Sequence, residues 1–189
     1  MRKLIAAMKT SVDGKAEGRD GIADWVDAWS EDFGLTSQID ACVLGAGMYP
    51  GYEWYWTSIL NEPQKPVWIT GNPPTPAEIA WARFAAETPH YVLSRTLTEV
   101  AFPNTTLVQS LDDVAKLKQR TGKDMYLIGG AQVTAACIDE GLVDELRLII
   151  FPLIAGEGKS PFPRSRRPLE LQKVEQLANG RASLVYRFG

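Results

Sequence analysis

The sequence predicts an α/β fold built on a mostly parallel sheet that ends in antiparallel strands. Three observations lead to this prediction. Short apolar runs recur along the chain, and most are followed by glycine or another turn residue, as is typical of strands that lead into loops. Segments with helical spacing of apolar residues lie between them, so strands and helices alternate. The last two apolar runs have no helix of normal length between them, which favours an antiparallel ending.

The predicted strands are short apolar runs bounded by turn residues. They cover residues 4–8, 41–44, 91–93, 105–108, 125–128, 146–150 and 184–188. Residues 67–70 are expected to be extended, but the prolines on both sides argue against a place in the sheet. Residues 169–177 alternate polar and apolar side chains and form a candidate edge strand.

Four segments are predicted to be helices. Residues 23–33 place four large apolar side chains at helical spacing. Residues 76–86 begin with a proline, which the first turn of a helix accepts. Ser110 is expected to cap a helix that ends at residue 120. Residues 131–140 follow two glycines and are stopped by a third.

Length and composition indicate one globular domain over residues 1–189. Hydrophobic residues make up 45% of the chain and charged residues 23%, which is ordinary globular usage. The net charge of −3 and the lack of a long basic run argue against nucleic-acid binding. No apolar segment reaches the ~20 residues of a membrane span, and no signal sequence is recognisable. We therefore expect a cytoplasmic protein that does not contact membranes.

Cysteine and histidine are too few for a disulfide framework or a metal site. Cys42 and Cys137 lie in separate apolar runs and are predicted to be buried, reduced thiols. Neither belongs to a CxxC pair, and His90 is the only histidine, so no bound metal is expected. His90 is predicted to be an exposed structural residue just before a strand.

The strongest local signal is a buried strand followed by Gly129, Gly130 and a helix. Glycines at such a junction let a ligand approach the backbone. The free N–H groups of the first helical turn, together with the helix dipole, attract an anion such as a nucleotide phosphate. The alternative is a tight turn that binds nothing.

Two further loops follow predicted strands. Gly45 and Gly47 come after residues 41–44, and Met48 opens the next turn, which is either a second phosphate loop or a plain turn. Ser94 and Arg95 follow residues 91–93, at the end of the sheet where ligands of parallel sheets bind. An arginine grips phosphate through two parallel N–H bonds, so Arg95 is either the residue that reads a 2′-phosphate or a plain surface residue.

Seven segments occur in the order found in one family. They are residues 2–8, 11–14, 43–49, 92–97, 128–131, 141–146 and 152–162. The sequence resembles the dihydrofolate-reductase-like superfamily, specifically the reductase domain of the bifunctional deaminase-reductase of riboflavin biosynthesis and its stand-alone relatives. The resemblance covers nearly the whole chain. The zinc signature of the deaminase half is absent from it.

The resemblance implies a three-layer α/β/α fold, with an eight-stranded mixed sheet that binds NADPH along its strand ends. Gly45, Gly47 and Met48 would contact phosphates of the cofactor, and Ser94 and Arg95 its adenosine 2′-phosphate. The residues that would hold the pyrophosphate are Gly129, Gly130, Ala131, Gln132 and Val133. Ala7, at the end of the first strand, would lie near the nicotinamide.

The chain departs from the family in two places. Ala46 stands where the family often has an arginine, which removes a cation from the first phosphate loop. The proline-rich residues 67–76 resemble an insertion that covers or reshapes the pocket.

The substrate side is less determined. The resemblance makes Asp13 a candidate substrate contact and proton donor, because in the riboflavin branch its turn faces the pocket. The alternative is an Asx-turn in which Gly14 takes a positive φ. Trp25 and Tyr49, with Tyr52, Trp54 and Trp56, either stack on a planar substrate or belong to the core or to a subunit interface.

These observations together predict an NADPH-dependent oxidoreductase. It would transfer a hydride to a C=N or C=O bond of a small pterin-like or pyrimidine-like heterocycle, with the proton supplied by water or by Asp13. The alternative is a catalytically silent protein of the same fold that binds a nucleotide or a pterin. The resemblance also implies a homodimer.

Overall fold

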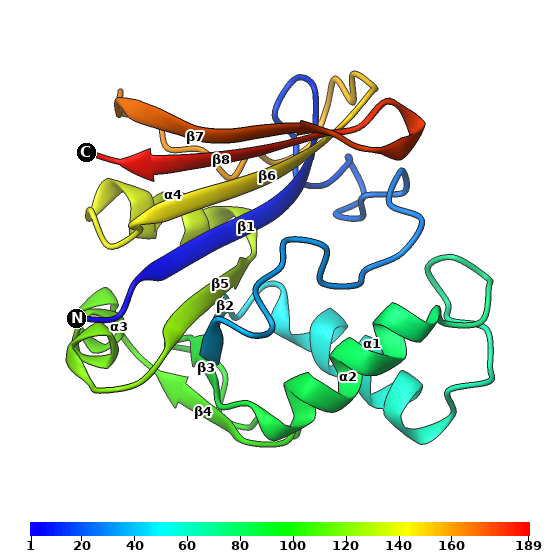
Figure 1. Ribbon diagram of the computed structural model, residues 1–189. Coiled ribbons are helices and arrows are strands. Elements are labelled where there is room, and N and C mark those ends of the chain that lie inside the picture. The colour runs from blue at the N-terminus through cyan, green and yellow to red at the C-terminus, as the bar shows by residue number, and fades with distance from the viewer.

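One eight-stranded sheet forms the middle of the molecule in the computed structural model, which describes residues 1–189 (Figure 1). The strands are β1 (Leu4–Ser11), β2 (Ile39–Gly45), β3 (His90–Leu93), β4 (Thr105–Val108), β5 (Asp124–Gly129), β6 (Glu145–Phe151), β7 (Leu169–Gln176) and β8 (Ala182–Phe188). Their order across the sheet is β4-β3-β2-β5-β1-β6-β8-β7. Strands β1 to β6 pair in parallel, and β8 is antiparallel to both β6 and β7. The predicted antiparallel ending is confirmed, and β7 is the candidate edge strand.

Four α-helices cover the sheet. They are α1 (Tyr49–Asn61), α2 (Pro76–Glu87), α3 (Leu111–Gln119) and α4 (Ala131–Asp139). Thr75 and Ser110 cap α2 and α3, and each takes part in a reciprocal capping box with the acidic residue three positions later. The predicted helices 76–86, 110–120 and 131–140 are therefore confirmed. None of the helices has the length and apolar composition needed to cross a membrane.

The alternation of side chains along β1 explains the three layers. Ile5 and Ala7 point to one face, where they pack in a core with residues of α1 and α2. Leu4 and Ala6 point to the other face and pack with residues of α3 and α4. The helix pairs therefore lie on opposite sides of the sheet, as Figure 1 shows.

The prediction of a helix over residues 23–33 is wrong, because this stretch is irregular. Glu31 accepts hydrogen bonds from the backbone N–H groups of Phe33, Leu35 and Thr36. Within the predicted helix, the N–H groups of Trp29 and Phe33 are therefore bound by the side chains of Glu78 and Glu31 and not by backbone carbonyls four residues earlier. The apolar residues still face inward, and Val26 packs with residues of β6.

Residues 67–70 form a turn rather than an extended segment. The N–H of Val67 donates to the carbonyl of Asn72 at 2.9 Å, and the N–H of Gly71 donates back to the carbonyl of Val67 at 2.8 Å. Helix α1 was not predicted. Its signal was present, since its residues Tyr52, Trp56 and Ile59 recur at helical spacing and are buried, but the proline and glycine in its first turn masked the pattern.

The prediction that His90 is exposed is also wrong. Its side chain is buried at the start of β3, where Nε2 lies 2.8 Å from the Tyr52 hydroxyl and Nδ1 lies 2.7 Å from the Thr88 carbonyl. Burial lowers the pKa of His90 to about 4. Cys42 and Cys137 are buried free thiols, as predicted.

Candidate active site

A cavity of about 1030 Å³ lies at the carboxyl ends of the parallel strands. Loops after β2, β3 and β5 line one half of it, through residues 45–48, 93–95 and 130–133. We call this part the glycine-loop half. The other half lies between β1, α1, α2 and the irregular segment 21–33. We call it the aromatic half, because its lining includes Trp29, Phe33, Tyr52, Tyr55, Trp56, Trp68, Trp81 and Tyr126.

The start of α4 offers free backbone donors to the glycine-loop half. The first N–H groups of a helix have no partner within it, and Gly130 at the N-cap has no side chain to satisfy them. Gly129 has a φ of +132°, a conformation that favours glycine. A Cβ on Gly45 would stand 3.0 Å from the Val133 side chain, so the loop after β2 packs directly on this turn of α4.

The start of α1 faces the same half of the cavity. Its N-cap residue, Met48, makes no side-chain capping bond, whereas α2 and α3 are both capped. The two helices that begin beside the glycine loops, α1 and α4, are therefore the two without a capping side chain, and Pro50 leaves α1 one N–H donor fewer than α4. Such positions favour a negatively charged ligand.

Ser94 and Arg95 lie at the outer end of the glycine-loop half. The Ser94 hydroxyl accepts hydrogen bonds from the N–H groups of Thr96 and Leu97 at 3.1 and 2.8 Å, which leaves its own proton to donate. Arg95 is exposed, lines the cavity and forms no ion pair. Its guanidinium is free to bind an anionic group.

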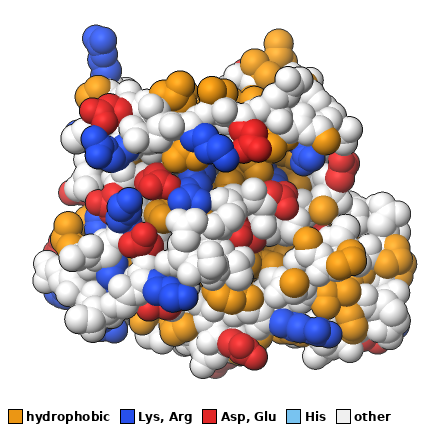
Figure 2. Space-filling model, in the orientation of Figure 1, with side chains coloured by type: hydrophobic (Ala, Val, Ile, Leu, Met, Phe, Trp, Pro, Cys, Tyr) orange, Lys and Arg blue, Asp and Glu red, His pale blue; other side chains and the backbone are white.

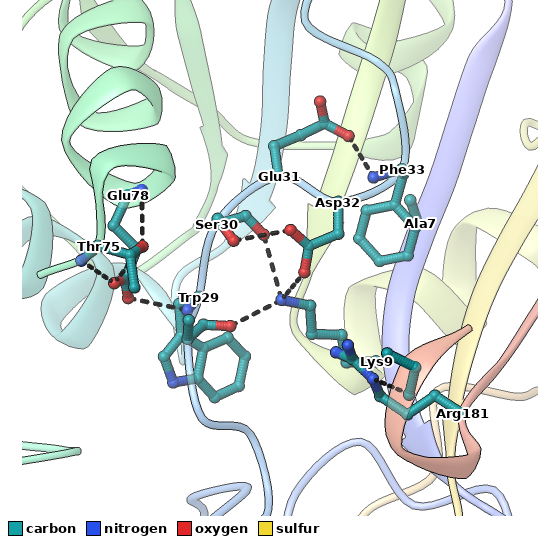
Figure 3. Close-up of polar contacts among 12 residues, drawn as sticks. Ala7, Lys9, Trp29, Ser30, Glu31, Asp32, Phe33, Thr75, Glu78 and Arg181 are labelled. Atoms are coloured by element: carbon teal, nitrogen blue, oxygen red, sulfur yellow. Dashed lines mark hydrogen bonds and ion pairs between the residues drawn. The ribbon is translucent and has the colours of Figure 1, made fainter.

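Lys9 lines the aromatic half and lies on the same face of β1 as Ala7 (Figure 3). Its ammonium donates to the carbonyls of Ala28 and Ser30 at 2.8 and 3.2 Å and forms an ion pair with Asp32 at 2.7 Å. Burial lowers the pKa of Lys9, and Asp32 opposes this effect. All three N–H bonds of Lys9 hold the irregular segment against the sheet.

Glu78 of α2 fastens the same segment from the other side (Figure 3). Its carboxylate accepts hydrogen bonds from the Trp29 N–H at 2.9 Å, the Tyr55 hydroxyl at 2.6 Å and the Thr75 N–H at 2.8 Å. Burial raises the pKa of Glu78, but these hydrogen bonds outweigh it and hold the pKa below its usual value. Lys9 and Glu78 thus fix the backbone on both sides of Trp29.

Hydrophobic side chains gather on the surface over α1, α2 and the connection between them (Figure 2). Trp54 of α1 and Trp68 of this connection are both about half exposed, and their ring centroids are 5.2 Å apart. Trp68 and Ile69 also line the aromatic half of the cavity. The proline-rich segment 67–76 therefore contributes to its wall.

Most of the residues singled out in the sequence come together at this cavity. Those that line it are Ala7, Gly45, Gly47, Met48, Ser94, Arg95, Gly130, Ala131, Gln132 and Val133. Gly129, Trp25 and Tyr49 are not part of the lining. Tyr49 is buried, and its hydroxyl accepts a hydrogen bond from the Phe102 N–H at 3.0 Å. Contact of any of these residues with a cofactor or a substrate stays a prediction.

The structure does not bring Asp13 into the cavity. Its carboxylate accepts hydrogen bonds from the Ser11 hydroxyl at 2.6 Å and from the N–H groups of Ala155 and Gly156 at 2.9 Å each. These bonds lower the pKa of Asp13 to about 2, and Gly14 takes a φ of +73° beside it. Asp13 ties two loops together as an ionised group, which corrects the expectation of a proton donor.

Sequence reasoning missed most of the aromatic half. Lys9 had a signal, because it lies two residues after Ala7 in a strand and so shares its face. Trp29, Glu31 and Trp68 had none, because irregular segments place them and local patterns do not specify such segments.

Comparisons with known proteins agree with this architecture. The RibD C-terminal domain family matches residues 2–182. Protein YyaP of Bacillus subtilis (strain 168), whose name describes it as uncharacterized, is 31% identical over an alignment of 196 positions, which covers 99% of this chain and 95% of YyaP.

Solved structures share the fold at lower identity. A putative riboflavin biosynthesis protein from Shewanella sp. PV-4 aligns with a TM-score of 0.68 at 20% identity and covers 99% of both chains. Dihydrofolate reductase from Enterococcus faecalis, in complex with NADP(H) and RAB-propyl, aligns with a TM-score of 0.62 at 14% identity over 99% of this chain and 96% of its own. A deaminase/5-amino-6-(5-phosphoribosylamino)uracil reductase from Thermotoga maritima aligns with a TM-score of 0.61 at 15% identity over 100% of this chain and 57% of its own.

The expected dihydrofolate-reductase-like fold, with three layers around an eight-stranded mixed sheet, is thus confirmed. Since the family match extends over nearly the whole chain, this protein is a member of the RibD C-terminal domain family.

Proposed function

We propose that this protein is an NADPH-dependent reductase that transfers a hydride to a C=N or C=O bond of a small heterocycle. One observation carries the proposal. Two helices without capping side chains and an arginine without an ion pair border a single cavity, whose other half is walled by aromatic rings. The first set suits the phosphates of a dinucleotide, and the second suits flat rings.

The residues present fit NADPH group by group. The N–H groups of Ala131, Gln132 and Val133 suit the diphosphate, since no side chain competes for them. Arg95 and Ser94 suit the 2′-phosphate, as a free cation and a free hydroxyl donor. The small side chain of Ala7, on this face of β1, leaves room for the nicotinamide ring. The E. faecalis dihydrofolate reductase, described with NADP(H), supports the same choice.

In this mechanism the chain binds, orients and excludes water. NADPH, when bound, supplies the hydride. The aromatic walls keep bulk water from the reacting ring, and the backbone fastened by Lys9 and Glu78 holds Trp29 and Phe33 in place. Because Asp13 is engaged outside the cavity, a water molecule rather than Asp13 would supply the proton to the nitrogen or oxygen of the reduced bond.

The direct test is a titration of the purified protein with NADPH, followed by the fluorescence of the nicotinamide. We expect saturable binding with a blue-shifted, enhanced emission. If millimolar NADPH leaves the emission unchanged, the proposal fails.

A second candidate function is a binding protein that retains the fold without turnover. It is favoured by the lack of an unengaged acid or base in the aromatic half, where Lys9 and Glu31 are both fully hydrogen-bonded. Absorbance at 340 nm separates the two functions. A reductase oxidises NADPH with at least one member of a panel of pterins, pyrimidinones, folates and quinones, whereas a binding protein shows cofactor affinity with no oxidation.

A further inference from the structure

We infer, on the basis of the proposed function, that the aromatic half takes a flat ring compound that carries no phosphate or carboxylate group. The inference goes beyond the proposed reaction because it names the class of substrate. It follows from the charges of that half and from the partners that already engage them.

No cation in the aromatic half is free to bind an anion. Lys9 directs its three N–H bonds at Ala28, Ser30 and Asp32, so none is left for a ligand. Lys159, at the rim, is 2.5 Å from a carboxylate oxygen of Glu17. Arg181, just before β8, lies near Lys9 (Figure 3), but its guanidinium donates to the Ala178 carbonyl, stacks over the Phe151 ring and does not line the cavity.

The unpaired cation of the cavity lies at the opposite end. Arg95 follows β3, which is separated from β1 by β2 and β5. At ~4.8 Å per strand, three strand spacings place β3 about 14 Å from β1. Arg95 therefore serves the glycine-loop half and is too distant to neutralise a group held over Lys9.

Carboxylates outnumber cations around the aromatic half. Glu31 lines it, Asp32 pairs with Lys9, Glu17 pairs with Lys159, and Glu78 lies buried behind Trp29. The carboxylate of Glu31 is satisfied by three backbone N–H groups and the Thr36 hydroxyl, with no positive side chain beside it. An anionic ligand would meet a field of its own sign.

The aromatic walls also disfavour an anionic ligand. The faces of aromatic rings carry partial negative charge and attract neutral rings or cations. A phosphate moved from water into this half would lose its hydration and gain no charged partner, which is strongly unfavourable. A neutral heterocycle loses far less hydration than a phosphate and gains stacking contacts.

The inference separates this chain from one structural neighbour. The T. maritima reductase is named for a phosphoribosylamino-uracil substrate, which carries a phosphate. We expect this protein to reject that phosphorylated compound and to accept an unphosphorylated ring.

Matched pairs of ligands test the inference. The protein is saturated with NADP⁺, which binds without turnover, and then titrated with each member of three pairs while tryptophan fluorescence is recorded. The pairs are 5-amino-6-(ribosylamino)uracil and its 5′-phosphate, riboflavin and flavin mononucleotide, and pterin and 6-carboxypterin. In every pair that shows binding, we expect the uncharged member to bind at least about tenfold more tightly.

Each outcome has one meaning. Equal or tighter binding of the anionic members would overturn the inference. Binding of NADP⁺ without binding of any ring compound would also overturn it, while leaving the cofactor half of the proposed function intact. Failure of NADP⁺ itself to bind would instead refute the proposed function.

Two variants examine the cause of the discrimination. Asp32→Asn leaves the charge of Lys9 uncompensated, and Glu17→Gln does the same for Lys159, whose side chain is exposed. Both are expected to reduce the preference for the uncharged member at least about threefold, with NADP⁺ affinity unchanged. Glu175→Gln on the exposed strand β7 removes the same charge far from the cavity and serves as the control. An unchanged preference in both variants would show that charge does not cause the discrimination.

Discussion

At the scale of single residues, a substitution of Arg95 tests whether the cavity prefers NADPH to NADH. Only NADPH carries the 2′-phosphate assigned to this guanidinium. We expect Arg95→Ala to raise the Kd for NADPH about tenfold or more, the usual effect of losing a charge-assisted hydrogen bond, and to change the Kd for NADH less than about twofold. Fluorescence titrations with both cofactors measure the difference. Arg83→Ala, on the exposed side of α2, is the control, and equal losses for both cofactors would contradict the role given to Arg95.

The buried His90 should make the free energy of unfolding depend on pH. The Thr88 carbonyl can only accept, so Nδ1 carries the proton and Nε2 accepts from Tyr52, which describes a neutral imidazole. With a folded pKa of about 4 against an ordinary 6.5, the unfolded chain binds more protons between these values. The free energy of unfolding should therefore fall as the pH drops from 6.5 to 4, by up to about 3 kcal/mol.

Urea unfolding at several pH values, with His90→Gln beside the unsubstituted protein, measures this contribution. The variant lacks the titrating group, so its stability should decrease less over the same range. Parallel curves for the two proteins would show that His90 does not titrate as described.

At the scale of elements, the two glycines at the end of β2 differ in how much space a larger side chain would have. A Cβ on Gly45 would approach the Val133 side chain to 3.0 Å, whereas a Cβ on Gly47 would have no neighbour within 4 Å. Gly45→Ala should destabilise the protein by about 1–3 kcal/mol and displace the start of α4. Gly47→Ala should be neutral or slightly stabilising, because it restricts the unfolded chain.

Urea midpoints of the two variants, together with their Kd values for NADPH, check this pair. Weaker NADPH binding is expected in Gly45→Ala, since α4 carries the amide donors. If both substitutions have the same effect on stability, the close packing of Gly45 on α4 is not what the loop requires.

The irregular segment 21–33 shows why helical spacing alone was misleading. Its apolar residues do face inward, but the N–H groups of Trp29 and Phe33 are bound by the side chains of Glu78 and Glu31 rather than by backbone carbonyls. Lys9 and Glu78, which are distant in sequence, hold the rest. Capping patterns were more informative, because a residue such as Ser110 and the acidic residue three positions later act within one turn.

At the scale of the whole molecule, the homodimer implied by the family resemblance is a proposal for which β7 offers a surface. β7 is exposed throughout, and Leu169, Leu171 and Val174 are 39, 54 and 63% exposed. A register shift after Leu171 pairs Leu171 with Tyr186 and Val174 with Leu184, so both apolar residues share one face. A second copy would present the same apolar row, as a two-fold interface requires.

Light scattering coupled to size exclusion tests the dimer. We expect a mass of about 42 kDa, twice the 20.9 kDa of the chain, and a mass near 20.9 kDa for Leu171→Glu. Glu175→Gln, on the opposite face of β7, should remain dimeric. A monomeric unsubstituted protein would refute the proposal.

The sequence by itself determined the alternation of strands and helices, the antiparallel ending and the glycine-bearing junctions at the strand ends. Those features depend on periodicity, capping and turn chemistry, which act over a few residues. Only the tertiary structure decided that Asp13 lies outside the cavity, that His90 is buried and that Lys9 is fully engaged. These outcomes depend on partners far away in the chain, such as Ala155 for Asp13 and Ala28 for Lys9, and no local pattern specifies such contacts.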